Sequence, residues 1–173
     1  MAEALLLIDF QRDFLSPDGR MPIAEGQVAD VIAATNELID AAKRRGDLVA
    51  AISNEFHQFD PLNIFRRNAA LAGSPGACWD ERVRSTGASY FRKWRGDAFC
   101  NPLLQQFLKE KGIDALSIAG LMASACVTAT AKSALRRGFR VTVVARAVAD
   151  TSERRRQIAL ERLCHSGITI WKN

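Results

Sequence analysis

The sequence predicts an α/β protein: a three-layer α/β/α doubly wound sandwich with a six-stranded, mostly parallel sheet in the order 3-2-1-4-5-6. Short apolar runs alternate along the chain with longer segments in which apolar residues recur at helical spacing, a pattern typical of βαβ units. No repeat and no low-complexity segment interrupts the 173 residues. Because that length is ample for one buried core, we expect a single domain over residues 1–173.

The first half of the chain is predicted to hold three strands and one long helix. The run Ala4–Ile8 is apolar throughout, as expected of a strand that is buried on both faces. Apolar side chains recur at helical spacing over Gln27–Arg45, and Gly46 suits the end of that helix. The next strands are expected at Leu48–Ile52 and Ala88–Arg92. The long segment between them is broken by proline and glycine, and long loops in compact domains are usually functional.

The second half repeats the alternation with shorter helices. One helix is predicted over Pro102–Lys111, and another runs from the turn after the fourth strand to Arg137, where Gly138 ends it. Ser152 is placed to cap the last helix, which continues through Leu163. The remaining strands are expected at Ala115–Ala119, Arg140–Ala145 and Ile168–Trp171.

The composition is that of an ordinary globular protein, with 48% hydrophobic and 25% charged residues. The formal net charge of +5 comes from short basic runs scattered along the chain. A nucleic-acid interface would need one clustered basic stripe, so we expect no nucleic-acid partner. No apolar run is long enough to span a membrane and no secretory signal is visible, so we expect a cytoplasmic protein. The four cysteines include no Cys-x-x-Cys pair and are expected to be free thiols.

Three polar residues fall where ligands bind in such folds, at the carboxyl ends of the strands near the point where strand order reverses. Asp9 ends the first strand, Lys93 follows the third, and Cys126 begins the helix after the fourth. The first and fourth strands are neighbours in the predicted order, so Asp9 and Cys126 should face each other. Lys93 starts two strands away, roughly 10 Å at normal strand spacing, so it needs its long side chain to reach them.

These residue types suit nucleophilic catalysis. Free N–H groups at a helix N-terminus and a nearby ammonium are both expected to lower the pKa of the Cys126 thiol. The Asp9 carboxylate could accept the thiol proton and later deliver it to a leaving amine. Backbone N–H groups in the turn before Cys126 could stabilise a tetrahedral oxyanion. Each residue alone also has an ordinary structural interpretation, as a small buried side chain, a turn residue or a solvated lysine.

Three segments resemble the motifs of isochorismatase-like cysteine hydrolases. Leu7–Phe14 is similar to their D-x-Q-x-D-F opening, and Gly120–Ala131 is similar to their G-x-x-x-x-x-C-V-x-x-T-A nucleophile turn. Lys93, followed by Asp97-Ala98-Phe99, resembles their K-x-x-x-[SD]-A-F segment. The order and spacing of these motifs match over nearly the whole chain. The resemblance implies the doubly wound fold and the activity of a cysteine amidohydrolase.

The resemblance also implies a role for each residue of the trio. Cys126 would be the nucleophile, Asp9 the general base and acid, and Lys93 the residue that stabilises the thiolate and the transition state. Members of this family carry a non-proline cis peptide bond before the nucleophile turn, which would be Leu121–Met122 here. The oxyanion hole would be formed by the N–H groups of Met122 and Cys126.

Two departures from the family limit what the resemblance implies. Many members have Asp where this chain has Arg146, so no acidic role is expected there. Nicotinamidases hold a divalent metal with Asp-x-His after the second strand and a later histidine. Glu55 and His57 align with that pair, but the other histidine, His165, lies in the last predicted helix. We therefore expect no metal and no other cofactor, and His57 is expected to line the pocket.

The substrate is expected to be a small molecule with an amide, ureido or related C–N bond that is cleaved through an acyl-enzyme. The walls of its pocket are expected to come from Phe10, Phe14, Phe56, His57 and Trp94. The alternatives are an isochorismatase-type or nicotinamidase-type hydrolase, and a non-catalytic binding or redox module that keeps a reactive thiol. A nucleotide-binding domain is disfavoured because no Gly-x-Gly-x-x-Gly follows the first strand. Homologous folds often assemble as dimers or larger oligomers, so a homo-oligomer is expected.

Overall fold

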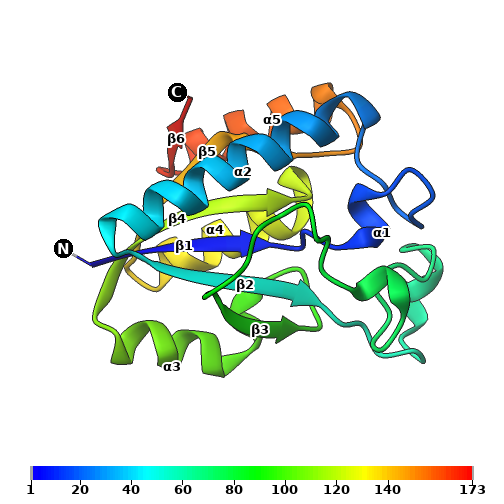
Figure 1. The fold of residues 1–173 in the computed structure, drawn as a ribbon, viewed down its shortest axis with the longest axis horizontal. Helices are drawn as coiled ribbons and strands as arrows, with labels where there is room; N and C mark the ends of the chain where they lie inside the picture. Colours follow the sequence, from blue (N-terminus) through cyan, green and yellow to red (C-terminus); the bar gives the residue numbers. More distant parts are fainter. Residues whose placement is uncertain (1, 173) are drawn as a thin grey trace.

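The computed structural model describes residues 2–172 and contains a six-stranded sheet. Every strand pair is parallel, and the strand order is β3-β2-β1-β4-β5-β6. The predicted fold class and strand order are therefore confirmed (Figure 1). The strands are β1 (Ala2–Ile8), β2 (Leu48–Asn54), β3 (Ser89–Lys93), β4 (Ile113–Leu121), β5 (Arg140–Ala149) and β6 (Thr169–Trp171).

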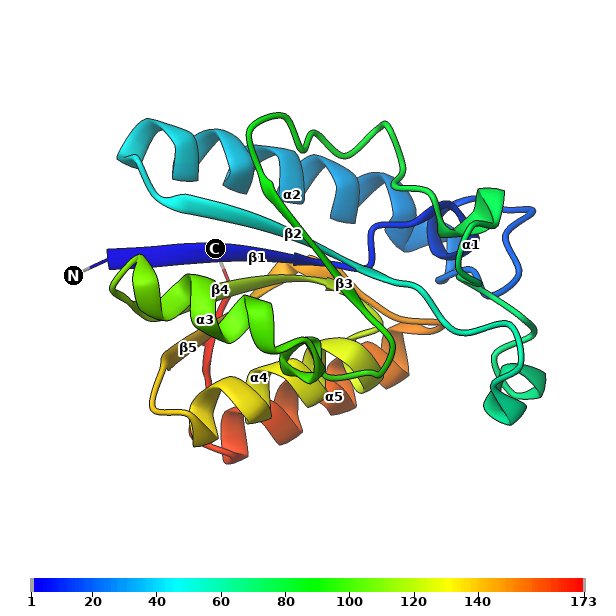
Figure 2. The ribbon, with the colours of Figure 1, turned by 90° about the horizontal axis from the view of Figure 1, so that it is seen from below.

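Helices cover both faces of the sheet. One face carries α2 (Glu25–Arg45), and the other carries α3 (Pro102–Glu110), α4 (Thr128–Arg136) and α5 (Glu153–His165) (Figure 2). A short helix, α1 (Arg12–Leu15), follows β1 almost directly. These three layers leave the carboxyl ends of β1 and β4 together at one edge of the sheet.

Two apolar cores, one on each face, explain why β1 is apolar throughout. Leu6 and Ile8 belong to the core beneath α3, α4 and α5, whereas Leu5 and Leu7 belong to the core beneath α2. Successive side chains of a strand point to opposite faces, so a strand between two helical layers needs apolar residues at every position.

Three strands extend by two or more residues further at their carboxyl ends than the sequence predicted. β2 and β4 continue to Asn54 and Leu121, and β5 runs past its predicted end at Ala145. The register between β4 and β5 shifts at that point. Such a bulge leaves extra residues unpaired without ending the strand. The polar Arg146 lies in this bulge, which is why the sequence predicted that the strand would end just before it.

The segment between β2 and β3 forms a lobe beside the carboxyl ends of the strands (Figure 2). It contains the 3-10 helices η1 (Pro61–Ile64) and η2 (Pro75–Ala77). Asp13 of α1 fixes this lobe, since its Oδ2 accepts the N–H of Ala70 at 2.7 Å. Gly76 lies so close to the same carboxylate that a Cβ there would stand 2.1 Å from its oxygen. The lobe is therefore held against α1.

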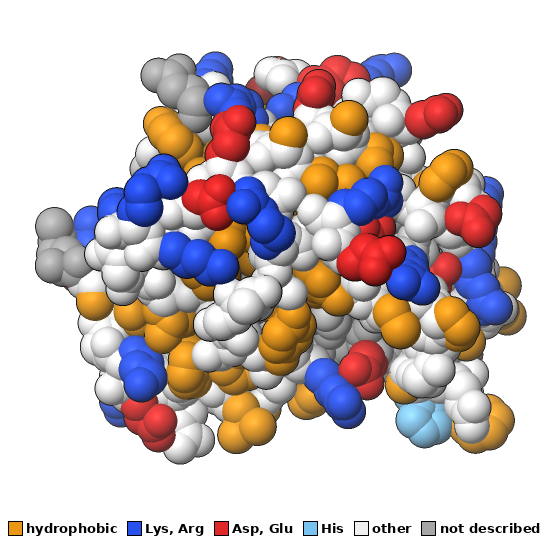
Figure 3. All heavy atoms as spheres, viewed as in Figure 1, with side chains coloured by type: hydrophobic (Ala, Val, Ile, Leu, Met, Phe, Trp, Pro, Cys, Tyr) orange, Lys and Arg blue, Asp and Glu red, His pale blue; other side chains and the backbone are white. Residues whose placement is uncertain are grey.

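The surface of the molecule carries both signs of charge. Basic and acidic side chains are interspersed over the face in Figure 3. Exposed ion pairs join Arg84 to Asp40 at 2.9 Å and Arg146 to Glu37 at 2.6 Å. Within residues 2–172, no helix is long and apolar enough to cross a membrane.

Candidate active site

Asp9 and Cys126 lie at the carboxyl ends of the two central strands. Asp9 directly follows β1, and its φ of 59° turns the chain sharply out of the strand. This left-handed conformation is uncommon for a residue with a side chain, although Asp tolerates it better than most. Cys126 lies in η4 (Ala123–Val127), a π-helical turn between β4 and α4. Because β1 pairs with β4, both side chains lie in one site.

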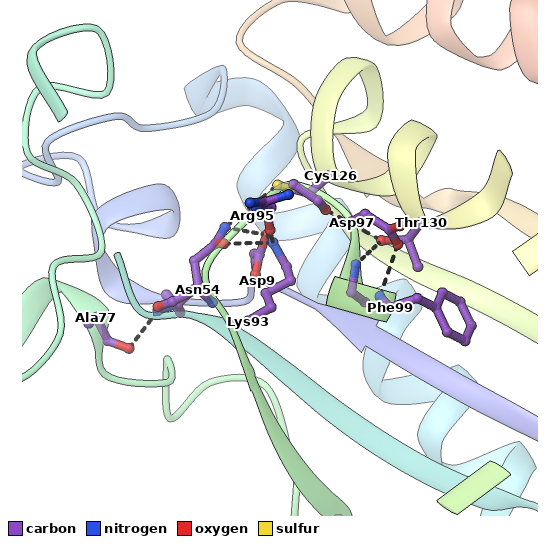
Figure 4. A network of polar contacts seen from close by, with 12 residues as sticks. Asp9, Asn54, Ala77, Lys93, Arg95, Asp97, Phe99, Cys126 and Thr130 are labelled. Atoms are coloured by element: carbon purple, nitrogen blue, oxygen red, sulfur yellow. Dashed lines mark hydrogen bonds and ion pairs between the residues drawn. The ribbon is translucent and has the colours of Figure 1, made fainter. Parts of the chain in front are cut away.

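The side chain of Lys93 is long enough to reach Asp9 even though their strands are not neighbours in the sheet. It is the last residue of β3 and is completely buried. Its Nζ lies 2.9 Å from Asp9 Oδ2, beyond the intervening strand β2. It also donates to the carbonyl oxygen of Arg95 at 3.1 Å. The long side chain thus brings a cation to the site, and the structure places all three residues together (Figure 4).

Asn54 connects these three side chains and was missed by the reasoning from sequence. Its Nδ2 donates to Asp9 Oδ2 at 2.8 Å and lies 3.6 Å from Cys126 Sγ, and its Oδ1 accepts from Lys93 Nζ at 2.7 Å. It is 1% exposed. Asn54 ends β2, the strand between those that carry Asp9 and Lys93, so strand order and a polar residue at that end were the available signal (Figure 4).

Gln11, the Gln of the D-x-Q segment, fixes the backbone of Asn54. The N–H of Asn54 donates to Gln11 Oε1 at 2.9 Å, and Gln11 Nε2 donates to the carbonyl oxygen of Asn54 at 2.8 Å. The same Nε2 donates to the carbonyl oxygen of Ala77 at 2.7 Å. Gln11 is completely buried, so these bonds hold the end of β2 and the lobe to one point.

Close packing of β4 on β1 shapes the turn that carries Cys126. A Cβ added to Gly120 would lie 2.5 Å from the carbonyl oxygen of Ile8, so only glycine allows this approach. The peptide bond Leu121–Met122 that follows is cis.

Asp150 holds the same turn from the other side and was also missed. It follows β5, is completely buried, and its Oδ2 accepts the N–H of Ser124 at 2.7 Å. Its Oδ1 accepts from Arg155 Nε at 3.2 Å. The family's acidic position had been aligned with Arg146, but that side chain pairs with Glu37 at the surface. A buried acidic residue therefore does contact the turn that carries Cys126, but it is Asp150 and not the residue at position 146.

The segment after Lys93 is tied to α4. Asp97 caps a 3-10 turn by accepting the N–H of Phe99 at 2.9 Å, and it accepts the hydroxyl of Ser133 at 2.6 Å. The N–H of Ala98 donates to Thr130 Oγ1 at 3.0 Å (Figure 4). These bonds give the Asp-Ala-Phe segment a structural function, since they dock it on the helix that follows Cys126.

The electrostatics of the site differ from the expectation for the thiol. Burial, and after it the negative charge of Asp9, raise the pKa of the Cys126 thiol to about 11 against the lowering effect of Lys93. The prediction of a lowered thiol pKa was therefore wrong, because the thiol is buried and the nearby ammonium is already paired with a carboxylate. Burial also raises the pKa of Asp9, against the lowering effect of Lys93. Burial lowers the pKa of Lys93, but Asp9 and Cys126 together outweigh burial, and the net pKa of Lys93 is raised.

A cavity of about 250 Å³ opens beside the sulfur. Its lining residues are Asp9, Phe14, Met21, Asn54, Phe56, Arg66, Ala69, Gly96, Leu121, Met122, Ala125 and Cys126. Phe14 and Phe56 therefore lie where pocket residues were expected.

Three other residues predicted for the pocket wall do not line this cavity. Phe10 is completely buried and packs edge-on against Trp79, with ring centroids 5.9 Å apart. Trp94 is 47% exposed, and His57 is exposed on the lobe beside Phe59. Each prediction was wrong because it rested on closeness in sequence to a site residue, and neighbouring side chains point in different directions.

The residues aligned with a nicotinamidase metal site do not fit one. Glu55 Oε1 pairs with Arg92 Nε at 3.0 Å, and His57 Nδ1 accepts the N–H of Phe59 at 3.3 Å. Over the described range 2–172, no group of three or more His, Cys, Asp or Glu side chains is arranged to hold a metal ion. A structural or catalytic zinc site needs at least three protein ligands.

The fold and the site define a class: doubly wound α/β proteins with a buried Asp, Lys and Cys cluster where strand order reverses. The isochorismatase domain model matches residues 3–172. The chain therefore belongs to the isochorismatase family, and it is a hydrolase.

Individual relatives agree with this assignment. The isochorismatase family protein PncA of Bacillus subtilis is 28% identical over 96% of this chain and 96% of its own length. Maleamate amidohydrolase of Pseudomonas putida is 32% identical over 85% of this chain and 72% of its own length. The crystal structure of the nicotinamidase PncA from Bacillus subtilis is similar with a TM-score of 0.90 at 25% identity, covering 99% of this chain and 100% of that one.

Proposed function

We propose that this hydrolase cleaves an amide, ureido or related C–N bond of a small molecule through a covalent acyl-enzyme on Cys126. The observation that carries the proposal is the buried cluster in which Asp9, Lys93 and Asn54 surround the sulfur at the end of a small cavity. Nothing about buried structural thiols requires an adjoining buried carboxylate and ammonium, and assembling them costs desolvation energy.

The free oxygen of Asp9 supports its role as the base. Oδ2 is occupied by Lys93 and Asn54, whereas Oδ1 is buried and has no hydrogen-bond partner in the described part of the chain. A buried acceptor without a partner is costly, so its retention is typical of a functional site. In the proposed reaction, Oδ1 receives the proton of the Cys126 thiol while the sulfur attacks the carbonyl carbon.

The raised pKa of the thiol makes proton transfer part of the attack. With a pKa of about 11, Cys126 rests as a neutral thiol at neutral pH. Asp9 takes the proton as the carbon–sulfur bond forms, and passes it to the nitrogen that leaves when the C–N bond breaks. The Lys93 ammonium keeps the Asp9 carboxylate ionised and stabilises the developing thiolate.

The second half of the reaction restores the enzyme. Water attacks the thioester carbonyl and loses its proton to Asp9, and the proton returns to sulfur as the acid product departs. The N–H groups of Met122 and Cys126 are the proposed donors to the tetrahedral oxyanion in both halves. Both residues line the cavity.

The type of substrate bond that the enzyme cleaves is inferred from the site and from the names of its relatives. Maleamate amidohydrolase and nicotinamidase are named for the amides on which they act. A nicotinamidase-type activity that depends on a metal is less well supported because Glu55 and His57 do not fit a metal site. An isochorismatase-type vinyl-ether cleavage would leave the sulfur unused.

The test is a screen of small amides and ureides for ammonia or amine release by wild type, Cys126→Ala and Asp9→Asn. We expect turnover by wild type that both variants lose by roughly a thousandfold or more, with a thioester adduct on Cys126 in quenched samples. Turnover that survives in Cys126→Ala would contradict the acyl-enzyme. Modification of Cys126 without turnover of any compound would favour a binding or redox module.

We also propose a homo-oligomer in the cytoplasm. Phe59, Ile64 and Phe65 on the lobe are 79%, 80% and 83% exposed, and clustered exposed apolar side chains favour an interface. Hydrophobic side chains lie on the surface beside the pale-blue histidine in Figure 3. Light scattering on the purified chain measures the oligomeric state directly.

The proposed cytoplasmic location rests on the cysteines. All four cysteines are unpaired, as in a reducing compartment.

A further inference from the structure

We propose that Arg66 selects the substrate: a short amide or ureide that carries a carboxylate, which Arg66 binds while its carbonyl lies at Cys126. This inference rests on the proposed function and adds the chemical class of the substrate. Arg66 and Cys126 line the same small cavity, although they lie on separate elements far apart in sequence.

Charge is distributed unevenly around the cavity. The carboxylate of Asp9 lies at the end with the sulfur, and Arg66 is the cation among the lining residues. The remaining wall is mostly apolar, formed by residues such as Phe14, Met21 and Phe56. The charges of Asp9 and Lys93 are already paired with each other, and a carboxylate is strongly disfavoured against apolar groups, so Arg66 is the position where it is stabilised.

The guanidinium of Arg66 is held in place before any ligand arrives. Its Cζ lies 4.0 Å from the centroid of the Phe56 ring, which itself lines the cavity. Its Nη1 donates to Asp60 Oδ2 at 2.7 Å and lies 3.5 Å from Asn63 Oδ1. Both of these contacts use the same nitrogen. A stacked, anchored guanidinium loses little conformational entropy on binding and suits bidentate recognition of a carboxylate.

Donors remain for a second carboxylate. Among residues 2–172, neither Nε nor Nη2 of Arg66 has a hydrogen-bond partner. Asp60 does not line the cavity, and hydrogen bonding to Arg66 keeps the pKa of Asp60 below its ordinary value. Asp60 is thus an ionised anchor outside the cavity, and a guanidinium with five donors can pair with two carboxylates on different edges.

The lobe that carries Arg66 is tied to the catalytic end. Asp13 accepts the N–H of Ala70, and Ala69 is completely buried at the cavity wall. Arg66 is therefore part of a fixed wall, and only 23% of its side chain is exposed.

The experiment compares acids with matched neutral compounds. Malonamate, succinamate and glutaramate, and the methyl ester of each, are tested for ammonia release by wild type, Arg66→Met and the control Arg67→Met. Arg67 is the exposed neighbour on the same lobe and does not line the cavity. Methionine keeps an unbranched apolar stem against Phe56 while removing the charge. Thermal unfolding confirms that each variant is folded.

We expect wild type to prefer at least one acid over its ester. Arg66→Met should lower kcat/KM for that acid roughly 10- to 100-fold, the usual worth of hydrogen bonds to a charged group, and change the ester less than threefold. Arg67→Met should behave as wild type. Equal turnover of acids and esters by wild type, or equal losses for both in Arg66→Met, would overturn the inference about Arg66. The proposed function would still stand in either case, provided that turnover depends on Cys126. Absence of turnover from both series would also overturn the inference about Arg66, and the proposed function would then be judged by the thiol chemistry of Cys126 alone.

Discussion

Asn54 shows how one neutral side chain can organise two buried charges. Asp9 and Lys93 are 1% and 0% exposed, and a buried ion pair recovers its desolvation cost only when further hydrogen bonds satisfy it. The amide of Asn54 supplies a donor to the carboxylate and an acceptor for the ammonium. It also offers a donor to Cys126 Sγ, which stabilises the thiolate. We therefore interpret Asn54 as a positioning residue for the proposed reaction.

Replacing Asn54 with Ala is expected to lower kcat roughly 10- to 100-fold with little change in KM, because hydrogen bonds to charged groups near the sulfur are lost. The hydrogen bond from Asn54 lowers the pKa of Cys126, so its loss should move the alkylation profile of that thiol to higher pH. Steady-state kinetics and iodoacetamide labelling measure the two effects.

A matched control separates this role from a general loss of stability. Asn101 is also buried, and it caps α3 by accepting the N–H of Leu103 at 3.0 Å. Asn101→Ala should reduce the melting temperature and leave kcat and the alkylation profile near wild type. If both Asn variants behaved alike, Asn54 would be only a structural residue.

At the scale of the elements, the sequence predicted periodic segments well and their irregular ends poorly. The apolar run of β1 and the helical spacing of apolar residues in α2 predict those elements, because each apolar residue in the pattern packs against the core. The π-helical turn around Cys126 and the bulge in β5 have no such periodicity. They depend on contacts between distant residues, such as Asp150 with Ser124, which local sequence does not encode. Asp9, Lys93 and Cys126 were predicted at strand ends, whereas Asn54 and Asp150, also at strand ends, were missed because their roles depend on hydrogen bonds to residues far away in the sequence.

The approach of β4 to β1 provides a test at this scale. Gly120→Ala should destabilise the protein by about 1–3 kcal/mol, the usual cost of overpacking, because the new Cβ would stand 2.5 Å from the Ile8 carbonyl oxygen. Activity should fall with it, since the next residues lead into the nucleophile turn. Urea unfolding measures the change.

The control for that measurement is a glycine with open surroundings. Gly26 lies in α2, and a Cβ there would meet nothing within 4 Å. Gly26→Ala should stabilise the protein by about 0.5 kcal/mol or less, because Gly26 lies in the first turn of α2 and helix propensity acts fully only in the helix interior. Equal effects of the two substitutions would refute the close-approach argument.

At the scale of the whole molecule, the three-layer fold creates the environment that sets the charges of the site. The strand order that was predicted from alternating periods brings the ends of β1, β2, β3 and β4 to one edge. Helices and the lobe then bury that edge, which is why burial is the largest influence on the pKa values of Asp9, Lys93 and Cys126. The sequence did not show how deeply the strand ends would be buried, so the pKa of the Cys126 thiol could not be predicted from it.

This burial predicts the pH dependence of activity. Asp9 must be ionised to act as the base, and its pKa is raised above the ordinary 3.8. As pH falls, kcat/KM should therefore begin to decline at a higher pH than an exposed aspartate would cause. Lys93 should cause no loss on the alkaline side below about pH 10.5, because its pKa is raised above that value. Tryptophan fluorescence over the same range checks that the fold persists, and an acid limb at or below 3.8 would contradict the raised pKa.

The central claim is that Cys126 is a neutral thiol whose proton Asp9 controls, and its alkylation by iodoacetamide tests this most directly. Peptide mass spectrometry would follow Cys126 against pH in wild type and Asp9→Asn. Wild type should titrate near its pKa of about 11, and Asp9→Asn should titrate at lower pH and react faster at pH 8, because the Lys93 cation then faces the sulfur unopposed. An ordinary thiol titration near 9 in both proteins would contradict the account.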